Sequence, residues 1–288
     1  MTSFSIHPET KIGHVALTVA DMQRALAFYE DVLGFAVERR EHEVALRAGS
    51  GEPLILLTEL PGARPKPQRT TGLYHYAIRL PDRASLALVL QQLQRTGYGL
   101  QGASDHGVSE ALYLADPDGN GIEIYRDLPR GAWPRQGDDL KMGTAPLDVD
   151  GLLATPGAAT TDWHGAAEGT DIGHVHLHVA DLDAARRFYC DVLGFTLMQR
   201  YGSSALFVSA GGYHHHIGIN TWAGAGAPPP PADAVGLRYF ALRLPDRSVL
   251  DALVARLTGL GIATTPTPVG VRLLDPSQNT ILLTTTAG

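Results

Sequence analysis

His75 and Glu123 have side chains that can bind a metal ion or transfer a proton. Alternating apolar residues around each of them predict two strands, with both side chains on the face opposite the aliphatic residues. A carboxylate within an apolar strand is costly to bury unless it is paired or bound to a metal ion. Glu123 therefore needs a partner, and by the symmetry of the chain the nearest candidates are His14 and His75.

The segment that carries His75 and Glu123 recurs later in the chain with both residues replaced. Residues 72–77 read GLYHYA against GLRYFA at 236–241, and 116–123 read DPDGNGIE against DPSQNTIL at 275–282. The later copy has Tyr239 and Leu282 at the two positions. A residue needed only for the framework should appear in both copies, so His75 and Glu123 are the first candidates for function.

Further repeats divide the chain into two similar halves, each made of two modules. Residues 13–15 read GHV and recur at 173–175, and FYEDVLGF at 28–35 recurs as FYCDVLGF at 188–195. We expect a first domain at 10–127 with modules at 10–60 and 72–127, a linker at 128–169, and a second domain at 170–286.

The pattern within a module predicts one strand, one helix and three further strands, which makes the fold class α+β. Residues 15–19 alternate as in a two-faced strand. Asp21 then suits a helix N-cap, and Gly34 suits the end of that helix. Residues 36–57 show short apolar alternations typical of three antiparallel strands, and 84–96 read as an amphipathic helix.

Composition narrows the class of protein. A chain of 288 residues suits two domains, and a net charge of −7 argues against a nucleic-acid partner. The single cysteine, Cys190, excludes an internal disulfide. With no secretory signal and no apolar run of about 18 residues, we expect a cytoplasmic protein with no membrane partner, which could form a homo-oligomer.

The paired modules resemble the vicinal oxygen chelate superfamily, which includes glyoxalases, bleomycin resistance proteins and extradiol dioxygenases. The opening GHVALTVAD at 13–21 and the closing DPDGNGIE at 116–123 carry this resemblance. The segment from His106 through Tyr113 to Glu123 is similar to the extradiol ring-cleavage signature, and the layout resembles bacterial catechol 2,3-dioxygenases. The resemblance implies four βαβββ modules in two tandem domains, with mixed curved sheets and the helices outside.

The same resemblance implies a metal site built from His14, His75 and Glu123. Two imidazoles and one carboxylate on one side of Fe(II), or of Mn(II), leave adjacent positions for a substrate and O₂. His174 is the alternative third ligand, because modules of this superfamily can pair within a half or across halves. Sequential pairing within each half favours His14.

The implied reaction is extradiol cleavage of a catechol by O₂ to a product of the 2-hydroxymuconic-semialdehyde type. By the family pattern His106 and Tyr113 are catalytic: His106 would stabilise and protonate the bound oxygen, and Tyr113 would hydrogen-bond the substrate. Four aromatic residues are candidates to line the substrate pocket: Tyr74, Tyr76, Tyr125 and Trp133.

Two other functions and a second metal site stay open at this point. A glyoxalase-like lyase or isomerase would add a carboxylate ligand from the last strand of the first module, which here reads PLILL at 53–57. A non-catalytic small-molecule-binding or resistance protein would not require His106 and Tyr113. The later half is rich in histidine, and His174, His214 and His216 could form a secondary metal site, although that half lacks His75 and Glu123 counterparts.

Overall fold

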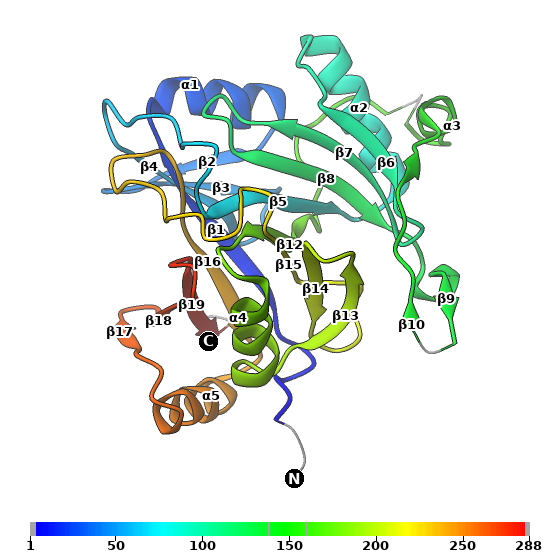
Figure 1. The fold of residues 1–288 in the computed structure, drawn as a ribbon. Helices are drawn as coiled ribbons and strands as arrows, with labels where there is room; N and C mark the ends of the chain where they lie inside the picture. The colour runs from blue at the N-terminus through cyan, green and yellow to red at the C-terminus, as the bar shows by residue number, and fades with distance from the viewer. Residues whose placement is uncertain (1–3, 138, 159–160, 286–288) are drawn as a thin grey trace.

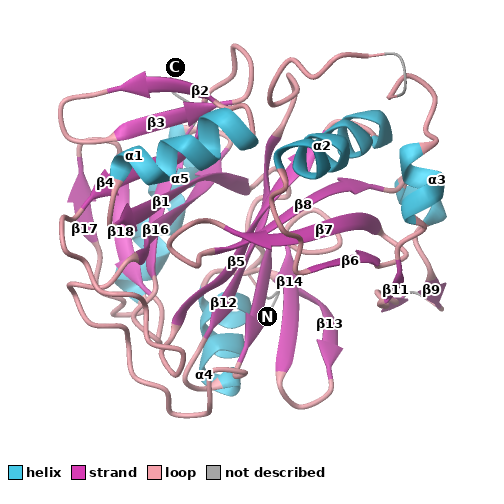
Figure 2. Ribbon diagram, turned by 90° about the horizontal axis from the view of Figure 1, so that it is seen from above, coloured by secondary structure: helices cyan, strands magenta, loops and turns pink. Residues whose placement is uncertain are grey.

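The computed structural model describes residues 4–137, 139–158 and 161–285, and it contains two large curved sheets with helices on their outer faces (Figures 1 and 2). This confirms the predicted α+β class. In the described residues no helix is long and apolar enough to cross a membrane.

Each of the four modules has the predicted order of one strand, one helical segment and three strands. The first module contains β1 (Lys11–Val19), α1 (Met22–Leu26), the π-helical turn η1 (Ala27–Val32), β2 (Ala36–Arg39), β3 (Val44–Arg47) and β4 (Pro53–Glu59). The second contains β5 (Gly72–Leu80), α2 (Arg83–Thr96), β6 (Gly102–Asp105), β7 (Ser109–Ala115) and β8 (Gly121–Asp127).

The later half repeats this order. The third module contains β12 (Asp171–His178), α4 (Leu182–Arg186), the π-helical turn η3 (Arg187–Val192), β13 (Thr196–Tyr201), β14 (Ala205–Ser209) and β15 (Ile217–Asn220). The fourth contains β16 (Gly236–Leu244), α5 (Arg247–Gly259), β17 (Thr265–Thr267), β18 (Gly270–Leu274) and β19 (Thr280–Thr285).

The helical segments begin and end as the local sequence predicts. The Asp21 carboxylate accepts a hydrogen bond from the Arg24 backbone N–H and caps α1, which satisfies a donor that the helix leaves free. The same helical run ends at Gly34, whose φ of 72° lies in the left-handed region that glycine tolerates.

The sheets join modules from different halves, so the expected pairing of modules within each half is wrong. One sheet has the strand order β17-β18-β19-β16-β1-β4-β3-β2, and the other β11-β6-β7-β8-β5-β12-β15-β14-β13. The antiparallel pairs β1–β16 and β5–β12 join the modules at the centre of each sheet. Neither 10–127 nor 170–286 therefore contains a complete sheet.

The segment expected to be a linker, 128–169, contains short elements, some of which pack against the second sheet. It contains η2 (Arg130–Ala132), β9 (Arg135–Gln136), β10 (Asp139–Leu140), β11 (Ala145–Pro146) and α3 (Val149–Leu153). Strand β11 extends the sheet beside β6, and Arg83 of α2 donates hydrogen bonds to Gly151 O and Thr155 Oγ1. Strand β11 therefore forms one edge of the second sheet.

Candidate metal centre and active site

Three buried side chains converge in the second sheet: His75 from β5, Glu123 from β8 and His174 from β12. The Oε2 atom of Glu123 lies 3.2 Å from His75 Nε2 and 3.1 Å from His174 Nε2, and the two imidazole nitrogens are 3.4 Å apart. The register explains the meeting, because β5 lies between β8 and β12 and pairs with both. Among the described residues this is the one group of three or more metal-ligating side chains within ligand distance.

His14 does not lie in this group, which corrects the expectation that it would join His75 and Glu123. It belongs to β1 in the other sheet, where its ring packs edge-on against Tyr239 at 5.6 Å between ring centroids. Tyr239 holds the position that His75 has in the second module, and it packs with three apolar side chains, Ala16, Ala45 and Leu56. The corresponding face of that sheet is therefore filled by aromatic and aliphatic groups.

The distances within the group fit a metal ion held on one side. With metal–ligand bonds of about 2.1 Å, two ligands at right angles would lie about 3 Å apart. The three observed separations of 3.1–3.4 Å match that geometry. Two imidazoles with one carboxylate form the donor set typical of non-haem Fe(II) sites with open positions.

The charge states that burial imposes also suit metal binding. Burial disfavours the charged form of His174 and lowers its pKa to about 4, against the opposing attraction of Glu123. Burial alone would raise the pKa of Glu123, but the hydrogen bonds from His174 and His75 hold it well below its usual range. At neutral pH the pair is thus a carboxylate and a neutral imidazole, which are the ligating forms.

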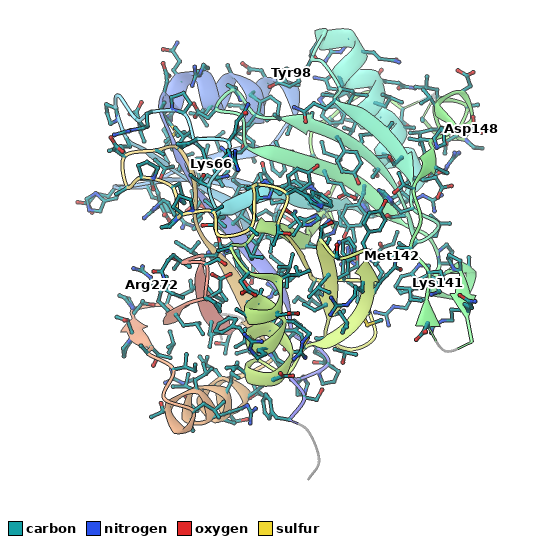
Figure 3. The ribbon with its side chains drawn as sticks, viewed as in Figure 1. Lys66, Tyr98, Lys141, Met142, Asp148 and Arg272 are labelled. Carbon is teal, nitrogen blue, oxygen red and sulfur yellow. The ribbon has the colours of Figure 1, made fainter. Side chains whose placement is uncertain are left out.

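A cavity of about 390 Å³ opens beside the group, and His75 and Glu123 line it. This volume lies within the usual range for small-ligand pockets. His174 is 1% exposed and lies deeper. Met142, labelled in Figure 3, lines the cavity together with Gly143 and Thr144, so the segment between the halves supplies one wall.

His106 and Tyr113 line the same cavity and bond to each other. The Nδ1–H group of His106 donates a hydrogen bond to Gly143 O, 2.7 Å away, because a carbonyl oxygen can only accept. With this hydrogen on Nδ1, Nε2 accepts a hydrogen bond from the Tyr113 hydroxyl, 2.6 Å away. The pKa of Tyr113 lies well above its ordinary value, mainly because the hydroxyl is buried and also because the charge of Glu123 is near. The hydroxyl therefore keeps its proton.

The cavity also contains residues that the sequence did not single out for it. His176 and His215 line it with Phe207 and Trp222. The His215 ring stacks on His174 at 4.1 Å between centroids, and burial lowers the pKa of His215 well below its ordinary value, which keeps it neutral. In the sequence, the run of three histidines at 214–216 could have indicated a functional histidine here. The conformation of the loop decides which of the three lines the cavity.

Of the four aromatic residues expected in the pocket, Tyr74 alone lines the cavity. Tyr76 points to the opposite face of β5 and donates a hydrogen bond to the Tyr29 hydroxyl in the core. Tyr125 bonds to the Tyr213 hydroxyl at 2.7 Å, and Trp133 donates to Leu128 O. These two therefore support the site from behind.

The predicted secondary group of His174, His214 and His216 does not assemble among the described residues. His214 Nε2 lies 2.9 Å from the Asp127 carboxylate, and His216 Nδ1 lies 3.0 Å from the Ser209 hydroxyl. His174 instead completes the group with His75 and Glu123.

Sequence comparison agrees with this architecture. A model of the Glyoxalase/Bleomycin resistance protein/Dioxygenase superfamily matches residues 11–124 and 171–281. The chain belongs to this superfamily. Within the superfamily, a protein named catechol-2,3-dioxygenase from Bacillus subtilis (strain 168) is 46% identical over 276 residues, which cover 94% of this chain and 96% of the relative.

Solved structures support the superfamily fold. A Bacillus subtilis structure, described as a candidate dioxygenase, has a TM-score of 0.70 at 14% identity and covers 99% of this chain and 87% of its own. Glyoxalase I from Zea mays has a TM-score of 0.56 at 16% identity, with 96% of this chain and 92% of its own covered. At these identities the likeness concerns the fold alone. The family model covers both motifs and confirms the resemblance drawn from them.

Proposed function

We propose that this protein is an extradiol dioxygenase that cleaves a catechol with O₂ to a product of the 2-hydroxymuconic-semialdehyde type. The observation that carries the proposal is the convergence of His75, Glu123 and His174 at one end of a cavity that also holds the bonded pair His106 and Tyr113. The name of the Bacillus subtilis relative, similar over nearly the whole chain, supports it.

His75, Glu123 and His174 would hold Fe(II), or alternatively Mn(II), through Nε2, Oε2 and Nε2. Such an ion, when bound, would hold the two catechol oxygens beside O₂ and pass electron density from the ring to oxygen. The protein supplies the shape around it. His174 and Glu123 are almost fully buried, and the aromatic rings of Tyr74, Phe207 and Trp222 line the cavity beside them.

His106, Tyr113 and His215 would handle protons. Tyr113 keeps its hydroxyl proton and donates it in the hydrogen bond to His106 Nε2, so the Tyr113 oxygen can accept a hydrogen bond from a substrate hydroxyl. His215 is a neutral imidazole at the cavity wall and can accept a proton from a substrate hydroxyl.

The cavity favours a catechol without a charged substituent. No lysine or arginine is among the described residues that line it, and Glu123 is its acidic member. A carboxylate on the substrate would therefore enter a low-dielectric space without a cationic partner, at a cost of several kcal/mol. Apolar substituents would instead contact Phe207, Met142 and Trp222.

The glyoxalase-like alternative is less well supported. It would need a fourth protein ligand, normally a carboxylate. Because modules two and three share the site, the strand that would supply it is β15, which reads IGIN and carries no carboxylate. A non-catalytic binding protein would leave the hydrogen-bonded His106 and Tyr113 unexplained.

A substrate panel tests the proposal. Protein loaded anaerobically with Fe(II) is exposed to O₂ with catechol, 3-methylcatechol, or 3,4-dihydroxybenzoate, and oxygen uptake and the yellow ring-opened product are followed. We expect turnover of both neutral catechols and at least about tenfold lower kcat/KM for the carboxylate. Protein shown to contain iron that consumes no oxygen with any of them would refute the function. Preference for the carboxylate would refute the substrate class alone.

A further inference from the structure

A line of hydrogen bonds leads away from the cavity through His215. Its Nδ1 lies 2.8 Å from Nδ1 of His214, and Nε2 of His214 lies 2.9 Å from Oδ1 of Asp127. His214 is fully buried between aromatic rings, with the Tyr213 ring stacked at 4.0 Å and the Trp133 ring at 5.4 Å between centroids. His214 therefore has little freedom to turn.

Asp127 is fixed as the acceptor at the far end of this line. It accepts hydrogen bonds from the Tyr213 hydroxyl at 3.0 Å and from Arg79 Nη1 at 3.1 Å, and Arg79 is held in turn by two bonds to Asp171. Burial would raise the pKa of Asp127, but the hydrogen bond from His214 and the charge and hydrogen bond of Arg79 keep it below its ordinary value. The carboxylate is thus ionised and can only accept.

The direction of each bond follows from that fixed end. Asp127 accepts from Tyr213 and Arg79, which places a hydrogen on His214 Nε2 where it faces the carboxylate. A His214 ring that carries this single hydrogen has a lone pair at Nδ1. That lone pair must accept from His215, which places the hydrogen of His215 on Nδ1. The His215 Nε2 lone pair is then left free, on a ring that lines the cavity.

We propose that Asp127 and His214 are positioning residues that lock His215 in the Nδ1–H tautomer and aim its Nε2 lone pair into the cavity. Neither of the two residues lines the cavity, so they act through His215 and not on the substrate. The tautomer is a property of the folded chain alone. Its consequence for turnover rests on the proposed dioxygenase function.

The ¹⁵N NMR spectrum of the full-length, metal-free protein labelled at histidine tests the tautomer directly. We expect a pyrrole-type Nδ1 and a pyridine-type Nε2 for His215, and the reverse for His214, with assignments made by His214→Phe and His215→Phe. A His215 ring with its hydrogen on Nε2, or a doubly protonated His214, would overturn the proposal.

The variant Asp127→Asn should reverse the hydrogen bond between residue 127 and His214, so that residue 127 becomes the donor. Arg79 and Tyr213 compete for the one amide oxygen, so the amide NH₂ faces His214 and shifts its hydrogen to Nδ1. His215 should switch to the Nε2–H tautomer. The control is Ser209→Ala, which removes the hydroxyl beside Nδ1 of the adjacent His216 and should leave the His215 signals unchanged.

Turnover gives the second readout. In iron-loaded Asp127→Asn with normal iron content we expect kcat to fall about 100-fold while KM for catechol changes by less than about twofold, because the cavity wall is unaltered. An Asp127→Asn protein that keeps the wild-type His215 tautomer, or one that changes tautomer without loss of kcat, would contradict the positioning role. Absence of any wild-type turnover would instead count against the proposed function.

Discussion

At the scale of single residues, the site depends on a carboxylate that is buried and yet ionised. Glu123 is 4% exposed and lies against His75 and His174, so both histidines offset the cost of its desolvation. The sequence predicted His75 and Glu123 because the second copy lacks them, and it predicted His106 and Tyr113 from the motif between them. His215 was missed, because the bend that turns it toward the cavity depends on contacts with His174 and Phe207.

Tyr113→Phe should reduce kcat by about 10- to 100-fold with little change in bound metal, because it removes the hydroxyl that bonds to His106 at the cavity without altering a proposed ligand. Steady-state kinetics and metal analysis measure both quantities. The matched control is Tyr98→Phe, which removes a hydroxyl bonded to Ala115 O in the same module and should leave kcat near the wild-type value. Equal losses in the two variants would contradict a role for Tyr113 in turnover.

At the scale of elements, the site depends on the close approach of β5 and β8. These strands pair in parallel, with His75 opposite Gly121 and Ala77 opposite Glu123. A Cβ at residue 121 would lie 2.2 Å from Tyr74 O, so a side chain there would push the strands apart. The strands and helices themselves were predictable, since capping residues and the period of apolar residues are local signals.

Gly121→Ala should therefore lower the free energy of unfolding by about 1–3 kcal/mol, the usual cost of an overpacked site, as measured by urea denaturation. It should also weaken metal binding, because Glu123 follows two residues later on β8. Gly102→Ala in β6 is the control, since a Cβ there meets no atom within 4 Å. Unchanged stability in Gly121→Ala would show that β5 and β8 can separate without cost.

At the scale of the whole molecule, the site depends on both halves of the chain. The pair β5–β12 joins them, and it brings His174 to His75 and Glu123, while β1–β16 takes His14 to the other sheet. The sequence could not decide between the two arrangements, because the opening strands of all four modules carry similar alternating patterns and either pairing would bury their apolar faces. Only the assembled sheets distinguish His174 from His14.

Metal content of the two histidine variants tests this assembly most directly. His174→Ala and His14→Ala are purified, loaded anaerobically with Fe(II), desalted and analysed for bound iron, with circular dichroism as the check that each is folded. We predict that His174→Ala loses at least about 90% of the iron, since it removes one of three ligands, and that His14→Ala retains it. Iron lost from folded His14→Ala and retained in His174→Ala would contradict the proposed site.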